Sequence, residues 1–310
     1  MPHPQSDLLY NKLMREWKEW EIKLLKYKDF PAGLQRVRPK VKQLFYRGEW
    51  KKDLFDKAVA VVGSRKITKY GRMATEMMVR GLTEAGYTIV SGFMYGVDTA
   101  AHKTCLENKG RTVAVLGCGL DCLTPAENDS LYTKILENGG LVVSEFTPKQ
   151  EAKLWTFPYR NRIVAGLSQA VLVIEAGEKS GSLVTARWAF QQKKKVLAVP
   201  GMITASLSKG TNWLIKNGAG LARDANDILE ELGGIRPLKE KRKGRILPKL
   251  RGEEAAVVEW LKREEMDADE LSRKLNKSIT QINILLSELC LKGVVEESGN
   301  KFMLGLEYVD

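Results

Sequence analysis

Six short, continuously apolar segments alternate with helical stretches along the middle of this 310-residue chain. Each holds three to five residues, mostly Val, Ile, Leu and Ala, without the polar alternation of a half-exposed strand. Because a helical stretch separates each segment from the next, we expect parallel strands that are covered by helices on both faces. The sequence therefore predicts an α/β protein. The six segments are 58–62, 88–90, 112–116, 141–143, 171–174 and 196–199.

Small polar residues follow these strands at the ends where open parallel sheets bind their ligands. Gly63, Ser64 and Arg65 come directly after the first strand, and the segment 177–182 follows the fifth strand and opens a helix. Such a turn gathers backbone N–H groups and the positive end of a helix dipole at one point. With Arg65 and Lys179 adding positive charge, the pattern predicts a phosphate site, for a nucleotide or for a nucleic-acid backbone.

The segment 157–162, Phe-Pro-Tyr-Arg-Asn-Arg, adds two arginines at a predicted helix start. Positive side chains oppose the helix dipole there, and a bound anion would relieve this arrangement. We therefore interpret Arg160 and Arg162, which flank Asn161, as anion contacts. Phe157 could belong to the core, or could stack on an unpaired base.

Sequence motifs of nucleotide-dependent enzymes are incomplete. No strand precedes a GxGxxG fingerprint, and the glycine-rich segment 177–182 lacks the order and spacing of a P-loop. Asp98 and His102 share one helix face, four residues apart. No nucleophile with a second base accompanies them, so we interpret the pair as structural rather than catalytic.

Several classes of protein are disfavoured by composition. No apolar stretch reaches the length of a membrane-spanning helix, and the N-terminus has no secretory signal pattern. The four cysteines lack the spacing of a metal site and fit reduced thiols. We expect a cytoplasmic protein without membrane insertion, metal or cofactor.

Charge divides the chain, which carries +12 overall. Segment 252–310 has seven basic and thirteen acidic residues, whereas segment 235–251 has eight basic and one acidic. Residues 1–234 therefore carry +11, which favours a polyanionic partner for this part. We expect an N-terminal helical segment and preface (1–56, with helical apolar spacing over 7–28), a main domain (57–234), a basic linker (235–251) and a small domain (252–310).

The small C-terminal domain has the pattern of a winged helix. Helical stretches at 255–261, 268–275 and from Thr280 precede a predicted hairpin around 294–304. The outer positions of the third helix carry no basic residue, and Ile284 adds an apolar group there. We therefore expect this acidic domain to dock on protein, within a dimer or on a partner, or to fold back on the basic main domain, rather than to read duplex DNA.

The main domain resembles the DprA/Smf family of DNA-processing proteins over about 59–232. The resemblance rests on ordered blocks, and two positions depart from the family pattern: Met94-Tyr95 replaces a usual basic residue, and Thr124 replaces a usual tyrosine. The matching blocks are 62–65, 91–102, 117–121, 157–168, 180–186, 198–201 and 210–215.

The resemblance implies an extended Rossmann-like parallel sheet that binds and protects single-stranded DNA, and helps to load the RecA recombinase. It also implies a homodimer that is not an enzyme and frequently has a C-terminal winged helix. The expected DNA contacts are Gly63, Ser64, Arg65, Phe157, Arg160, Asn161, Arg162, Lys179, Ser180 and Gly181.

The alternative is a nucleotide-binding Rossmann enzyme such as a nucleoside monophosphate phosphoribohydrolase. Those enzymes have a PGGxGT block followed closely by a glutamate. Here the segment 177–185 takes that place and no carboxylate follows in the next helix. This absence and the positive charge favour binding over hydrolysis.

Overall fold

The computed structural model describes residues 16–233, 250 and 252–305. The chain divides into two compact units, Met1–Leu238 and Lys239–Asp310. Their boundary falls within the predicted linker 235–251, of which only Leu250 is among the described residues.

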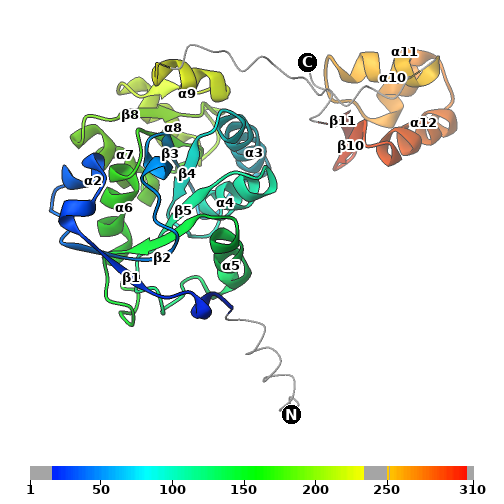
Figure 1. The fold of residues 1–310 in the computed structure, drawn as a ribbon. Coiled ribbons are helices and arrows are strands. Elements are labelled where there is room, and N and C mark those ends of the chain that lie inside the picture. Colours follow the sequence, from blue (N-terminus) through cyan, green and yellow to red (C-terminus); the bar gives the residue numbers. More distant parts are fainter. Residues whose placement is uncertain (1–15, 234–249, 251, 306–310) are drawn as a thin grey trace. The chain divides into compact units, whose positions relative to one another are not determined.

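A nine-stranded sheet forms the centre of the first unit, in the order β1-β2-β6-β5-β4-β3-β7-β8-β9 (Figure 1). All strands from β6 to β9 in this order run parallel, whereas β1 and β2 are antiparallel additions beside β6. The six predicted strands are confirmed as β3 to β8, and the sheet is Rossmann-like. The strands are β1 (Lys23–Lys26), β2 (Gln43–Gly48), β3 (Ala58–Val62), β4 (Thr88–Ser91), β5 (Thr112–Val115), β6 (Leu141–Ser144), β7 (Ala170–Val173), β8 (Lys195–Ala198) and β9 (Gly220–Leu221).

Helices cover both faces of this sheet, as strand β3 illustrates. Val59 and Val61 pack with α3, α4 and α9, whereas Ala60 and Val62 pack with α6, α7 and α8. A strand that is buried on both faces has no polar face to display, which explains the continuously apolar sequence of β3. The helices are α2 (Ala32–Gln35), α3 (Lys69–Glu84), α4 (Val97–Glu107), α5 (Asp129–Glu137), α6 (Thr156–Gly166), α7 (Gly181–Gln191), α8 (Lys209–Lys216) and α9 (Ala225–Glu231).

The N-terminal segment differs from the helix predicted over 7–28. Residues 1–15 lie outside the described residues, but 23–26 form the edge strand β1, with Leu25 buried in the sheet core. Pairing with β2 satisfies the β1 backbone, and this nonlocal pairing overrides the helical spacing. Trp17 is also buried: its ring stacks on Tyr132 with centroids 4.6 Å apart, and its Nε1 donates to Asp129 at 2.7 Å. The described part of the preface is therefore built into the first unit.

The second unit contains three helices and a two-stranded antiparallel hairpin, in the order that the sequence predicted. Val257, Leu271, Ile282 and Leu286 form its separate core. The membership of this unit in the winged-helix class remains a prediction. Its elements are α10 (Glu253–Leu261), α11 (Ala268–Leu275), α12 (Ile279–Leu291), β10 (Val295–Ser298) and β11 (Lys301–Leu304).

None of the described helices is both long and apolar enough to cross a membrane. Over the same residues, no group of three or more His, Cys, Asp and Glu side chains is arranged to hold a metal ion. The four cysteines are free thiols, and burial raises the pKa of Cys105 and of Cys118 to about 11.

Candidate nucleic-acid interface

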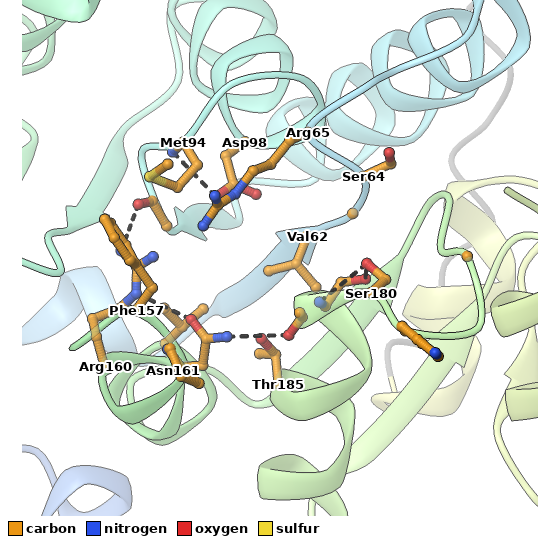
Figure 2. A pocket seen from close by; sticks show the side chains of 18 of the residues that line it. Val62, Ser64, Arg65, Met94, Asp98, Phe157, Arg160, Asn161, Ser180 and Thr185 are labelled. Atoms are coloured by element: carbon orange, nitrogen blue, oxygen red, sulfur yellow. Dashed lines mark hydrogen bonds between the residues drawn. The ribbon is translucent and has the colours of Figure 1, made fainter. Parts of the chain in front are cut away.

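A cavity of about 590 Å³ opens where β3, β4 and β7 end. Strand β3 lies between β4 and β7, and the chain leaves β3 toward one side of the sheet and returns to β7 on the other. Open α/β sheets bind their ligands at such a switch point. In Figure 2, Arg65, Met94 and Asp98 enter the cavity from one side, and Phe157, Arg160 and Asn161 enter it from α6 on the other.

The turn after β3 supplies the exposed cation of this cavity. A Cβ on Gly63 would lie 2.5 Å from Val97 Cγ2, so the close approach of this turn to α4 requires glycine. Ser64 fixes the turn, because its hydroxyl accepts a hydrogen bond from the Lys66 amide at 3.0 Å. Arg65 is exposed, and its guanidinium carbon lies 5.2 Å from the centroid of the Phe157 ring. The turn thus presents a cation stacked on a half-buried aromatic ring.

One face of α6 forms the opposite wall. Phe157 and Asn161 line the cavity, and the Asn161 side chain links two of its walls. Its Nδ2 donates to the Gly181 carbonyl at 3.2 Å, and its Oδ1 accepts from Arg160 Nε at 3.1 Å. The sequence interpretation missed Leu154 on this wall, although residues 154, 157, 158 and 161 have the spacing of one helix face.

The buried Arg160 lies at the inner wall of the cavity. Its Nη1 donates to the carbonyls of Gly92 and Val115. Burial lowers the pKa of Arg160 to about 10, so the group remains charged at neutral pH. A Cβ on Gly92 would lie 2.5 Å from Asp98 Oδ2 and 2.8 Å from Arg160 Nη2. Gly92 therefore leaves room for the Arg160 and Asp98 side chains, which both lie close to it.

Arg162 is outside the cavity and does not join the other predicted contacts. Its side chain is 0% exposed, and it pairs with both carboxylate oxygens of Glu145 at 2.5 and 2.6 Å. It also donates to the Pro39 carbonyl at 3.1 Å and lies over the Tyr159 ring at 3.8 Å. Residues two apart on a helix point about 200° apart, so Arg160 and Arg162 face different surroundings. We therefore exclude Arg162 from the candidate contacts with DNA.

The start of α7 supplies the third wall. Lys179 is exposed, and Ser180 is the N-cap residue, whose side chain accepts from the Ser182 amide at 3.3 Å. Helix α7 begins at Gly181 and runs for 11 residues, so its positive dipole end faces the cavity. This turn and the turn of Arg65 thus place positive electrostatic potential on two sides of the same space.

Asp98 and His102 have separate environments. Asp98 lines the cavity and accepts from the Met94 amide at 3.3 Å; burial raises its pKa to about 6 despite the nearby charge of Arg160. His102 is fully buried, and its Nδ1 lies 2.7 Å from the hydroxyl of Thr112. Burial lowers the pKa of His102 to about 3. No hydrogen bond joins Asp98 and His102, which supports the structural interpretation of this pair.

The two departures from the family pattern lie near this site. Met94 lines the cavity, whereas the neighbouring Tyr95 is exposed and donates from its hydroxyl to Glu127 at 2.6 Å. Glu127 follows the cis Thr124-Pro125 peptide closely. The hydrogen bond therefore connects the loops that carry the two departures.

The fold and the cavity together define a Rossmann-like α/β protein with a positively charged crevice at the switch point of its sheet. The chain belongs to the family described as DNA recombination-mediator protein A, whose profile matches residues 21–233. This is the DprA/Smf family that the sequence blocks indicated.

Relatives of known sequence support this membership. The chain is 43% identical over 202 residues to the DNA processing protein DprA of Streptococcus pneumoniae, a match that covers 65% of this chain and 71% of the relative. It is 45% identical over 174 residues to the protein Smf of Escherichia coli, a match that covers 56% of this chain and 46% of the relative. The chain thus spans less than half of the Escherichia coli protein.

Solved structures have the same fold. DprA from Streptococcus pneumoniae superimposes with a TM-score of 0.63 at 38% identity, over 73% of this chain and 77% of that chain. DprA from Helicobacter pylori gives a TM-score of 0.62 at 30% identity, over 69% of this chain and 96% of that chain. The Helicobacter pylori structure is described as showing a unique single-stranded DNA binding mode for that protein.

Proposed function

We propose that this chain binds single-stranded DNA in the cavity between the β3 turn, α6 and the start of α7. The observation that carries the proposal is the pairing of Arg65 with Phe157 at the cavity, 5.2 Å from guanidinium carbon to ring centroid. A phosphate could bind the guanidinium while the adjacent base contacts the aromatic ring. The likeness to a structure described for its single-stranded DNA binding mode supports the same ligand class.

The proposed contacts differ in what they offer to the DNA. Arg65 and Lys179 offer exposed charge to phosphates, whereas Arg160 adds buried charge at the inner wall. None of these contacts requires a particular base edge, so binding should tolerate any sequence and weaken with salt. The remaining proposed contacts are Gly63, Ser64, Phe157, Asn161, Ser180 and Gly181.

We favour a binding protein over an enzyme. Asp98 is the one carboxylate among the residues that line the cavity, and it is buried beside Arg160. A phosphoribohydrolase would need a carboxylate that reaches the ribose of its nucleotide, and the Asp98 side chain is buried, with the residue only 8% exposed. Incubation with AMP should therefore release no adenine, and measurable release would favour the alternative enzyme.

We also propose that this protein protects single strands, helps to load a RecA recombinase and acts as a cytoplasmic homodimer. Exposed aromatic residues support a protein interface on the first unit. Phe190 and Trp213 are both exposed and line a groove of about 580 Å³ beside α7 and α8. Met202 and Ile203 are also exposed. We propose this set of side chains as the homodimer surface, and sedimentation of a Trp213→Ala variant tests it.

The second unit is proposed to bind protein rather than DNA. On α12, Ile284 and Leu291 are exposed and seven residues apart, with Glu288 exposed between them. This face is apolar and acidic, whereas a helix that reads duplex DNA presents basic side chains to phosphates. The acidic balance of 252–310 supports the same conclusion.

The proposed function is tested by anisotropy titration of labelled oligo-dT with Arg65→Ala. We expect a loss of about 1–3 kcal/mol, the range for a charge-assisted contact together with the anion that it leaves unpaired. Arg80→Ala is the matched control, because Arg80 is an exposed arginine on α3 that does not line the cavity. If wild-type protein does not bind oligo-dT, the function is refuted. If Arg65→Ala binds like Arg80→Ala, this location of the site is refuted.

A further inference from the structure

An exposed tryptophan at the edge of the cavity has no part in the proposed contacts. Trp155 immediately precedes α6 and is 53% exposed. Its neighbour Leu154 lines the cavity and is 93% exposed. Two consecutive large apolar side chains therefore face solvent beside a positively charged site. Scattered exposed apolar residues are ordinary, but a contiguous pair at a cavity rim is typical of a binding surface.

The indole ring of Trp155 is held in a fixed orientation. The Phe146 ring meets it edge-on with centroids 5.9 Å apart and an interplanar angle of 78°. The Tyr159 ring also meets it at 5.9 Å with an angle of 68°, and Tyr159 is itself covered by the guanidinium of Arg162. Edge-to-face contacts of this kind orient an aromatic ring. Trp155 is thus held by two neighbouring rings while about half of its surface stays exposed, and such a ring is preorganised for stacking.

The position of Trp155 next to Leu154, just before α6, places it at the rim of the cavity. Leu154 precedes α6 and Phe157 lies in the first turn of α6, and both line the cavity, whereas Trp155 and Tyr159 are not among the residues that line it. Just before α6, Lys153 is exposed and forms no ion pair with any residue in the described part of the chain. A polyanion that passes Leu154 would therefore reach an aromatic ring and a cation together.

We propose that Trp155 is a second stacking platform, for the base next to the nucleotide whose phosphate lies at Arg65. This inference rests on the proposed binding of single-stranded DNA. The ligand is the face of an unpaired nucleobase of any identity, because every base offers a stacking face. A base within a duplex already stacks on both sides, so the platform selects single strands. Tyr159 is a positioning residue, which acts by orienting the Trp155 ring.

The test combines Trp155 variants with oligo-dT that carries one abasic site at successive positions. For wild-type protein, one abasic position next to the Arg65 nucleotide should lower affinity roughly five- to a hundredfold, the effect of one lost base–aromatic stack. Trp155→Ala should lose a similar factor on intact oligo-dT and be insensitive to the abasic site at that position. Trp155→Phe should restore the sensitivity in part. Tyr159→Leu should weaken the same abasic effect, and Tyr159→Phe should retain it.

Trp20→Ala is the matched control, because Trp20 is an exposed tryptophan outside the cavity. It should bind like wild-type protein and keep the full abasic effect. If wild-type protein binds and Arg65→Ala weakens binding, but Trp155→Ala keeps the wild-type affinity and abasic profile, the platform is refuted while the proposed function stands. If Trp155→Ala alters only the sedimentation behaviour, the exposed ring is a protein contact and the platform is equally refuted.

Discussion

Replacing Arg162 with methionine should destabilise the protein without removing a contact to phosphate. The guanidinium is fully buried and pairs with Glu145, whose side chain is only 11% exposed. Removing one partner of a buried ion pair costs roughly 3–5 kcal/mol, because the other charge stays buried without compensation. In a domain of this size, 1 kcal/mol shifts Tm by about 2–4 °C. We therefore expect Arg162→Met to lower Tm by roughly 10 °C.

A double-mutant cycle of Arg162→Met with Glu145→Gln isolates the interaction energy between these two side chains. The free energies of unfolding are measured by urea denaturation at pH 7. Each single variant should be destabilised, and the double variant should recover part of the loss, because no unpaired charge remains. Additive losses would show that the two side chains do not interact. A loss below about 0.5 kcal/mol for each single variant, typical of surface positions, would show that the pair is not buried.

The salt dependence of oligo-dT binding distinguishes a structural role of Arg162 from a direct contact between Arg162 and phosphate. Each phosphate contact on a single strand contributes about 0.7 to the slope of log affinity against log salt. Arg162→Met, once folded, should keep the wild-type slope, whereas Arg65→Ala should reduce it by about that amount. A reduced slope for Arg162→Met would refute the conclusion that Arg162 is structural.

Three further outcomes are expected. Gly92→Ala should cost about 1–3 kcal/mol of stability, measured by urea denaturation, and should weaken oligo-dT binding, because its Cβ would displace Asp98 and Arg160. His102 stays neutral in the folded protein but gains a proton on unfolding below pH 6.5, so its contribution to stability is lost as pH falls from 6.5 towards 3. Between pH 6 and 4, the free energy of unfolding of His102→Gln minus that of wild type should therefore rise by about 1.4 kcal/mol for each pH unit of acidification. A pH-independent difference would contradict the burial of a neutral imidazole. Deleting 252–310 should leave oligo-dT affinity unchanged or raised, since the segment is acidic, and abolished binding would contradict a protein-docking role.

The sheet was predictable because both of its faces are buried. Strands such as β3 have no solvent-facing positions, so their apolar runs are continuous and easily recognised. The end of α3 was equally predictable, because Gly86 adopts φ +79°, a conformation that favours glycine, just beyond the helix. The start of α3 has a similarly local cause: the Thr68 side chain caps the helix by accepting from the Gly71 amide at 3.0 Å.

Strand β1 was not predictable from local pattern. Leu24 and Leu25 fit a helical spacing, and four residues are too few to show the alternation of a strand. What makes this segment a strand is its pairing with β2, which in turn pairs with β6 about 100 residues later. Propensity is a weak guide where nonlocal pairing decides the structure.

The site was partly predictable. Turn residues after strands pointed to Arg65 and Lys179, because the carboxyl ends of parallel strands meet at one edge of the sheet. The sequence could not separate Arg160 from Arg162, because the acid that neutralises Arg162 is Glu145, which lies 17 residues earlier, just after β6. The buried position of Asp98 beside Arg160 also depends on tertiary packing. The helical spacing of Asp98 and His102 could not predict it.

The attachment of the N-terminal segment has a consequence for the order of folding. Trp17 packs on Tyr132 and Asp129, Arg47 donates to the Leu120 carbonyl at 2.8 Å, and β2 pairs with β6. These partners are synthesised some 70 to 115 residues after the segments that contact them. During translation, β1 and β2 can therefore join the sheet only after β6 has emerged. The part of the sheet that is made first is thus added late.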